Sequence, residues 1–97
     1  MEAIAKTIVF FNTRSNWGQG CADHQDIPPL CIVQALANNC TTNEEFTSSI
    51  DILERKLHEV WGTQYSTLSD FNDRIYPGRD NLAYKQIMKL LKMEVIN

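Results

Sequence analysis

Apolar residues between positions 43 and 61 recur every three or four residues, which is the spacing of one face of an α-helix. Thr42 and Glu45 form the T-x-x-E pattern of a capping box just before them, and Gly62 is suited to end the helix. So narrow an apolar face predicts a helix that packs on a shared core. The stripe consists of Phe46, Ile50, Leu53, Leu57, Val60 and Trp61.

Residues 2–12 are compatible with two structures. Ile4, Ile8 and Phe11 share one face of a helix at about 100° per residue. The run "KTIVFF" is also typical of a β-strand, because it is rich in β-branched and aromatic residues. We favour the helix, because the glutamate and two alanines at its start are compatible with helix formation.

Two more helices are predicted. Pro28 and Pro29 suit the first turn of a helix that runs to about Asn39, since a missing N–H has no cost there. The inner face of that helix would carry Val33, Leu36, Ala37 and Cys40. Asp80 is a good N-cap for a last helix at 81–93. Its inner face would carry Ala83, Ile87, Leu90 and Leu91.

Lys85, Lys89 and Lys92 gather on the opposite side of this last helix. We interpret them as a solvated face, with contact to an acidic partner as the alternative. Two long loops, residues 13–27 and 63–80, connect the helices, and the second has one short turn around residues 68–71. The chain of 97 residues is therefore predicted to form one all-α domain, residues 1–97, of about four helices.

Composition excludes several classes of function. The net charge is −3 and no long basic block exists, so general nucleic-acid binding is not expected. No apolar run approaches the roughly 20 residues of a membrane span, and no signal-peptide pattern is present. Three cysteines are an odd number without framework spacing, which predicts reduced thiols and a cytoplasmic location. We expect no cofactor.

A zinc site is the first candidate among the polar loop residues. Cys21, His24, Cys31 and Cys40 have spacing that is typical of zinc ligands. Cys31 and Cys40, however, are nine residues apart on one predicted helix, on opposite faces and roughly 13 Å apart along its axis. Zinc–sulfur bonds of about 2.3 Å cannot reach both. We therefore predict no metal and interpret Cys40 as a small core residue.

A thiol enzyme is the second candidate. Cys31 would lie in the first turn of a helix, where backbone N–H groups and the helix dipole stabilise a thiolate. Gln19 would serve an oxyanion hole and His24 or His58 would be the base. This set is similar to thiol hydrolases of the papain type, although those carry the histidine on a β-sheet domain that is not predicted here. We prefer Cys31 as a packing residue and His58 as a solvated one.

Trp17 would pack its ring on the core, and Gln19 would hydrogen-bond to backbone near Asn72 and Asp73, with Cys31 beneath them. A small-ligand pocket formed by Trp17, Gln19 and Asn72 is a further alternative.

The second loop offers either a polar binding site or turn and cap chemistry, and we favour the latter. Phe71 and Tyr76 would then anchor this loop on the core. The polar residues concerned are Asn72, Asp73, Arg79 and Asp80.

These motifs together resemble an uncharacterised family of short bacterial and phage proteins, a domain of unknown function. Its members have a Gly-Trp-x-Gln-Gly turn, a cysteine that leads an Ala-Leu helix, and a Trp-Asn-Asp segment before a Leu-rich helix. Here "NWG" replaces Gly-Trp and Asp80 replaces the usual threonine cap. The resemblance implies this helical order and a meeting of the two loops, with no settled activity. The matching residues are Trp17, Gly18, Gln19, Gly20, Cys31, Ala35, Leu36, Phe71, Asn72, Asp73 and Arg79.

Two functions from different classes are compatible with the sequence. The favoured one is a small non-enzymatic binding protein, monomeric or homodimeric, of the kind that phages use against a host protein in counter-defence or host takeover. Trp17, Tyr65 and Tyr76 would be its exposed aromatic anchors. Trp17, Gln19, Asn72, Asp73 and Arg79 are the candidate binding residues. The alternative is a cysteine-dependent hydrolase or transferase that uses Cys31, His24 and Gln19.

Overall fold

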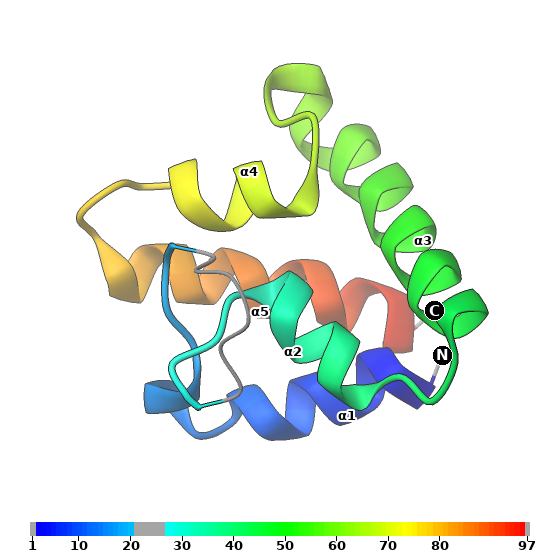
Figure 1. Ribbon diagram of the computed structural model, residues 1–97. Coiled ribbons are helices and arrows are strands. Elements are labelled where there is room, and N and C mark those ends of the chain that lie inside the picture. The colour runs from blue at the N-terminus through cyan, green and yellow to red at the C-terminus, as the bar shows by residue number, and fades with distance from the viewer. Residues whose placement is uncertain (1, 21–26, 97) are drawn as a thin grey trace.

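The computed structural model describes residues 2–20 and 27–96. Within this part of the chain it has five α-helices and no β-strand, so the all-α prediction is confirmed. None of these helices is both long and apolar enough to cross a membrane, a finding that covers the described residues only. The helices are α1 (Glu2–Phe11), α2 (Ile32–Asn39), α3 (Asn43–Trp61), α4 (Leu68–Arg74) and α5 (Asp80–Ile96), with 3-10 turns η1 (Arg14–Asn16) and η2 (Gly62–Gln64) (Figure 1).

One apolar core joins the five helices. α1 packs along α5 and also contacts α2, while α3 stands across one end of the α1–α5 pair (Figure 1). α4 contacts both α2 and α3. Every helix contributes large side chains that are fully buried. Those contributed by the helices are Ile4, Phe11, Ile32, Leu36, Leu53, Leu57, Leu68, Phe71, Ile87, Leu90 and Leu91.

The helices at the two ends of the chain agree with the sequence pattern. Residues 2–11 are helical, which decides between helix and strand, and Ile4 and Phe11 are fully buried. In α5 the predicted inner face is fully buried, as Ala83, Ile87, Leu90 and Leu91 show. Asp80 is the first residue of α5 and not the residue before it, a shift of one position.

The third helix has the predicted cap and most of the predicted inner face. Glu45 N donates to the Thr42 hydroxyl at 3.1 Å, while the Glu45 carboxylate accepts from Thr41 N at 2.8 Å. Val60 was expected inside and is 44% exposed, whereas Ser49 was not expected inside and is fully buried. The Ser49 hydroxyl donates to the carbonyl oxygen four residues earlier, so its burial leaves it hydrogen-bonded.

The second helix begins later than predicted. Pro28 and Pro29 lie outside α2, because the next residue, Leu30, pairs with the loop after α1. Leu30 N donates to Asn16 O at 2.8 Å, and Gly18 N donates to Leu30 O at 3.1 Å. The buried face of α2 also differs from the predicted one: its buried residues are Ile32, Ala35 and Leu36, whereas Val33 is partly buried and Ala37 is exposed.

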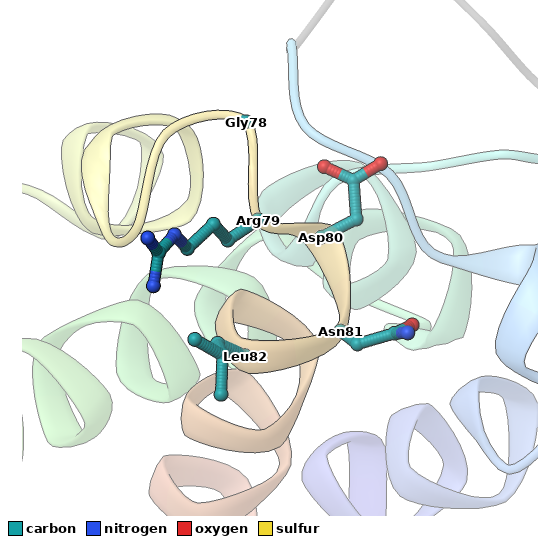
Figure 2. Close-up of a pocket in the computed structure, with 5 residues that line it drawn as sticks. All are labelled: Gly78, Arg79, Asp80, Asn81 and Leu82. Carbon is teal, nitrogen blue, oxygen red and sulfur yellow. The ribbon is translucent and has the colours of Figure 1, made fainter.

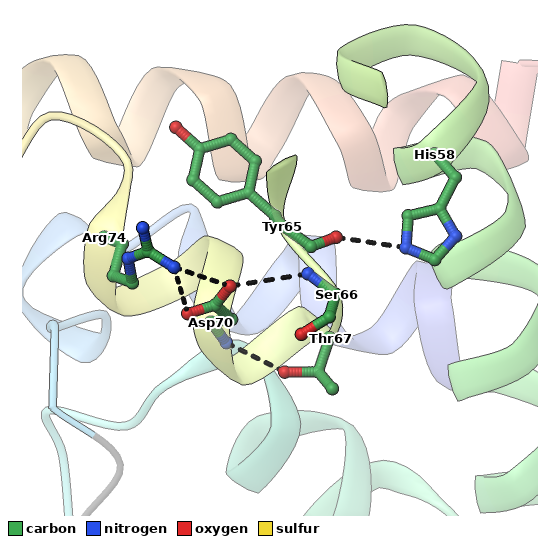
Figure 3. A network of polar contacts seen from close by, with 6 residues as sticks. All are labelled: His58, Tyr65, Ser66, Thr67, Asp70 and Arg74. Carbon is green, nitrogen blue, oxygen red and sulfur yellow. Dashed lines mark hydrogen bonds and ion pairs between the residues drawn. The ribbon is translucent and has the colours of Figure 1, made fainter. Parts of the chain in front are cut away.

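The segment predicted to be a second long loop contains α4, which raises the number of helices from about four to five. Thr67 caps it, since its hydroxyl accepts from Asp70 N at 3.1 Å (Figure 3). The Asp70 carboxylate in turn accepts from Ser66 N at 3.4 Å and from Arg74 at 3.1 Å. These bonds cap the N-terminus of α4 and add an ion pair, between Asp70 and Arg74, along its side. A helix of seven residues would not be stable alone.

Candidate functional site

The two loops meet at Asn72, a fully buried side chain of α4. Its Oδ1 accepts from the indole Nε1 of Trp17 at 2.7 Å and from Ile32 N at 3.1 Å. Its Nδ2 donates to Gly18 O at 3.1 Å and to a carboxylate oxygen of Asp73 at 3.0 Å. A primary amide can accept two and donate two hydrogen bonds, so Asn72 has none left for a ligand.

Gln19 and Gly20 add three bonds on the solvent side. Gln19 Nε2 donates to Asn72 O at 3.2 Å and to Ile75 O at 3.1 Å, and Gly20 N donates to Asp73 at 2.8 Å. The predicted bond from Gln19 to the backbone of residues 63–80 is therefore confirmed. We call this set the Asn72 junction, and its members are Trp17, Gly18, Gln19, Gly20, Ile32, Asn72 and Asp73.

The glycine at position 18 is required by close packing. A Cβ atom there would lie 2.9 Å from Cβ of Pro29, closer than side-chain carbons approach one another. The backbone of this loop therefore lies directly against the segment that leads into α2.

Trp17 is buried, which confirms that its ring packs on the core and contradicts its assignment as an exposed anchor. Its side chain is 2% exposed and its ring centroid lies 6.0 Å from that of Tyr84 in α5. The Arg14 guanidinium lies over both rings, 5.1 Å from Trp17 and 4.8 Å from Tyr84. Arg14 Nη1 donates to Trp17 O at 3.3 Å, whereas Arg14 Nε is buried without a hydrogen-bond partner among the described residues and the guanidinium lies against the two rings.

Cys31 does not have the features of a catalytic thiol. It is 1% exposed and disulfide-bonded, which contradicts the prediction of reduced thiols. It is also the N-cap of α2 and not a residue of its first turn. Cys21 and His24 lie outside the described residues. Gln19, the predicted oxyanion donor, already donates to two backbone carbonyls.

Cys40 is a free thiol at the other end of α2. Partial burial and, after it, the carboxylate of Glu45 raise the pKa of this thiol, against a smaller opposing hydrogen bond with Ser49. The thiolate fraction near pH 7 is therefore smaller than for an ordinary cysteine. Within the described parts of the chain, no three His, Cys, Asp or Glu side chains are grouped as ligands of a metal ion.

His58 holds the connection between α3 and α4. Its Nε2 donates to Tyr65 O at 3.0 Å (Figure 3), and Glu54 one turn earlier accepts from Leu68 N at 2.9 Å. The ring of Tyr65 packs edge-on against Phe71 at 5.3 Å. His58 is thus a structural residue and not merely a solvated one, and Tyr65 is partly buried where an exposed anchor was expected.

Arg79 makes no side-chain hydrogen bond or ion pair with the Asn72 junction among the described residues. Figure 2 shows Arg79 and Leu82 on one side of the start of α5, with Asp80 and Asn81 turned away from them. Together with Gly78 these residues line a surface hollow. The structure therefore separates Arg79 from the other four candidate binding residues.

Tyr76 lies three residues before Arg79 and is 46% exposed, so the prediction that it anchors its loop on the core is wrong. Its φ of 47° is uncommon for a residue with a side chain and is more restricted still before a proline. Arg79 N donates to Tyr76 O at 2.9 Å, which closes a tight turn through Gly78. This turn immediately precedes the first residue of α5.

A cationic face extends along α5 from this turn. Leu82, Lys85, Lys89 and Lys92 fall within about 80° of one another around the helix at about 100° per residue. All four are exposed. Lys89 Nζ lies 5.8 Å from the ring centroid of Trp61, so the face continues onto the end of α3. We call Arg79, Leu82, Lys85, Lys89 and Lys92 the α5 face.

The four cations of the α5 face have no ion-pair partner in the parts of the chain that the structure describes. Four of the other five cations do pair with a carboxylate, and Arg14 lies on aromatic rings. Residues 79–92 hold four cations against Asp80, a net charge of +3, so with a total of −3 the rest of the chain carries −6. The paired cations are Lys6 with Glu2, Arg55 with Asp51, Lys56 with Glu59 and Arg74 with Asp70.

Comparison with known proteins adds no relative. The chain matches no protein-family model, and no match to a curated protein or to a solved structure was found.

Sequence reasoning missed two members of these sites. Ile32 joins the Asn72 junction through its backbone N–H, which no sequence pattern marks. Leu82 belongs to the α5 face, and its spacing of three residues from Lys85 was a usable signal. Arg14 and Tyr84 were also missed, although a cation three residues before a tryptophan is too common a pattern to predict their stacking.

Proposed function

We propose that this chain is a non-catalytic binding domain that docks on another protein through the α5 face. The observation that carries the proposal is the set of cations on that face, which lack ion partners among the described residues while most other cations are paired. Ion pairs between exposed groups contribute little to the free energy of folding. The stability of the fold therefore does not account for four cations aligned on one face. Aligned charges of one sign do steer a partner of the opposite sign.

The Asn72 junction also supports a non-catalytic function. Its amide groups bond to one another and to backbone, so they hold the fold together and offer a ligand few free donors or acceptors. The buried, disulfide-bonded Cys31 leaves the hydrolase alternative without a nucleophile. The disulfide also removes the argument that placed the chain in a reducing compartment.

For the partner we propose a host protein, on the basis of the resemblance of these motifs to short bacterial and phage proteins. The chain would occupy a surface of that host protein and inhibit it in counter-defence or host takeover.

A capture experiment with matched variants tests the proposal. The immobilised chain is incubated with host-cell lysate beside two variants, Lys85→Gln/Lys92→Gln on the α5 face and Lys6→Gln/Arg55→Gln elsewhere. Both variants lose two positive charges, so general electrostatic effects are equal. Circular dichroism melting checks that both remain folded.

We expect a defined host protein to be retained by the native chain and by the Lys6/Arg55 variant, and to be lost by the Lys85/Lys92 variant. Equal retention by all three chains would contradict docking through the α5 face. Turnover of a thioester or peptide substrate that iodoacetamide abolishes would instead support the enzyme.

A further inference from the structure

We infer that the α5 face recognises an acidic α-helix of the partner, with carboxylates at three- and four-residue spacing and an apolar side chain at one end. This inference rests on the proposed function and names the chemistry of its partner.

Leu82, Lys85, Lys89 and Lys92 follow one another at intervals of three, four and three residues. This is the spacing of the a and d positions along a helix–helix seam. The three lysines span about 10 Å along the axis at 1.5 Å per residue. A partner helix lying nearly parallel to α5 would present Glu or Asp at the same pitch to each of them in turn.

The N-terminal end of the α5 face is suited to an apolar side chain. Leu82 is 38% exposed and borders the hollow at Gly78 and Arg79 (Figure 2). Tyr76, on the turn just before, is 46% exposed. An exposed leucine and tyrosine next to a row of lysines fit a partner whose acidic stripe ends in an apolar residue.

Charge excludes a symmetric dimer through this face. In a two-fold pair the same patch meets itself, so the lysines of one copy would oppose those of the other. An acidic partner surface relieves the uncompensated charge of +3 on residues 79–92, whereas a second copy of the α5 face doubles it.

Two other anionic surfaces fit less well. A membrane surface needs a continuous row of apolar side chains to insert, but most of those of α5 are buried in the core, as Ala83, Ile87, Leu90 and Leu91 show. The exposed apolar residues Leu82 and Val95 lie near opposite ends of the helix. A nucleic acid would meet only four cations on a chain of net charge −3. Both are therefore controls in the test.

The probe is a fluorescein-labelled, alanine-based 21-residue peptide that forms a helix, with glutamates spaced four and three apart on one face and a leucine one turn beyond them. Anisotropy titration at about 50 mM salt measures its affinity for the native chain. A peptide of identical composition with the glutamates scattered around the helix is the matched probe. Double-stranded DNA and vesicles with anionic lipid are measured in parallel.

We expect the Lys85→Gln/Lys92→Gln variant to bind the striped peptide about tenfold more weakly, and the Lys6→Gln/Arg55→Gln variant to bind within twofold of the native chain. The scattered peptide should bind at least fivefold more weakly than the striped one. Equal binding of both peptides, or tighter binding of DNA or vesicles, would overturn the inference.

The two proposals fail separately. If the lysate partner depends on Lys85 and Lys92 but the striped peptide does not bind, the acidic helix is refuted and the binding function stands. If no lysate protein depends on Lys85 and Lys92, the proposed function itself is refuted.

Discussion

Asn72→Ala should be among the most damaging single substitutions in this protein. It removes the partner of two N–H donors, the Trp17 indole and Ile32 N, and of one acceptor, Gly18 O. Trp17 is 2% exposed and Ile32 is fully buried, so water cannot replace the lost bonds. At about 1–3 kcal/mol for each buried group left unpaired, the two donors alone give a loss of about 2–6 kcal/mol.

That loss is a large share of the roughly 5–15 kcal/mol that stabilises a domain of this kind. At about 4–8 °C per kcal/mol, it corresponds to a fall in the midpoint of thermal unfolding of roughly 10–50 °C. Urea denaturation followed by tryptophan fluorescence measures the free energy of unfolding. Asn38→Ala is the matched control, because Asn38 is exposed on α2, and its effect should stay within about 0.5 kcal/mol.

A double-mutant cycle separates the hydrogen bond from the volume change. Trp17→Phe removes the indole N–H while keeping an aromatic ring, and its effect should not add to that of Asn72→Ala. A loss below about 1 kcal/mol for Asn72→Ala, or full additivity of the two, would refute the reasoning.

Three further outcomes follow from the structure. Leu53→Ala deletes a fully buried side chain and should cost about 2–4 kcal/mol in urea denaturation; a loss under 1 kcal/mol would show that α3 is not packed as described. Gly18→Ala would place its Cβ 2.9 Å from Pro29 and should destabilise by about 1–3 kcal/mol, whereas a neutral result would contradict the close approach. Alkylation of Cys40 by iodoacetamide at pH 7 should be slower than that of an unfolded-peptide cysteine, because burial and then Glu45 raise the pKa of the thiol, and Glu45→Gln should speed it. Faster labelling than the peptide would contradict the direction of that pKa shift.

The sequence contained most of the fold because its apolar periodicity is strong where the core is. The stripe around Leu53 and the inner face of α5 follow from spacing alone. α2 was misplaced because Pro28 and Pro29 are a strong local start signal, and only the long-range pairing of Leu30 with Asn16 overrides it. The first residue of α2 therefore depends on hydrogen bonds between Leu30 and residues 16–18, which the local sequence around the two prolines does not indicate.

The candidate site was predictable in part. Gln19 and Asn72 were expected to meet, because the resemblance to short bacterial and phage proteins implies that the two loops come together. The short helix α4 was missed because seven residues give too little periodicity, although Thr67 and Asp70 carried its cap pattern. The α5 face was seen as lysines on one side of a helix. That these lysines have no ion-pair partner among the described residues could not be predicted from the sequence, because ion pairing depends on which side chains lie close together in the fold.

The most direct test of the account is a map of the binding surface. Amide chemical-shift changes are recorded on the isotope-labelled chain as the striped acidic peptide is added. We predict amide chemical-shift changes concentrated on residues 79–92 and on Trp61, with the amides of Gly18, Gln19 and Asn72 unchanged. Changes centred on those three residues of the Asn72 junction, with α5 unaffected, would contradict it.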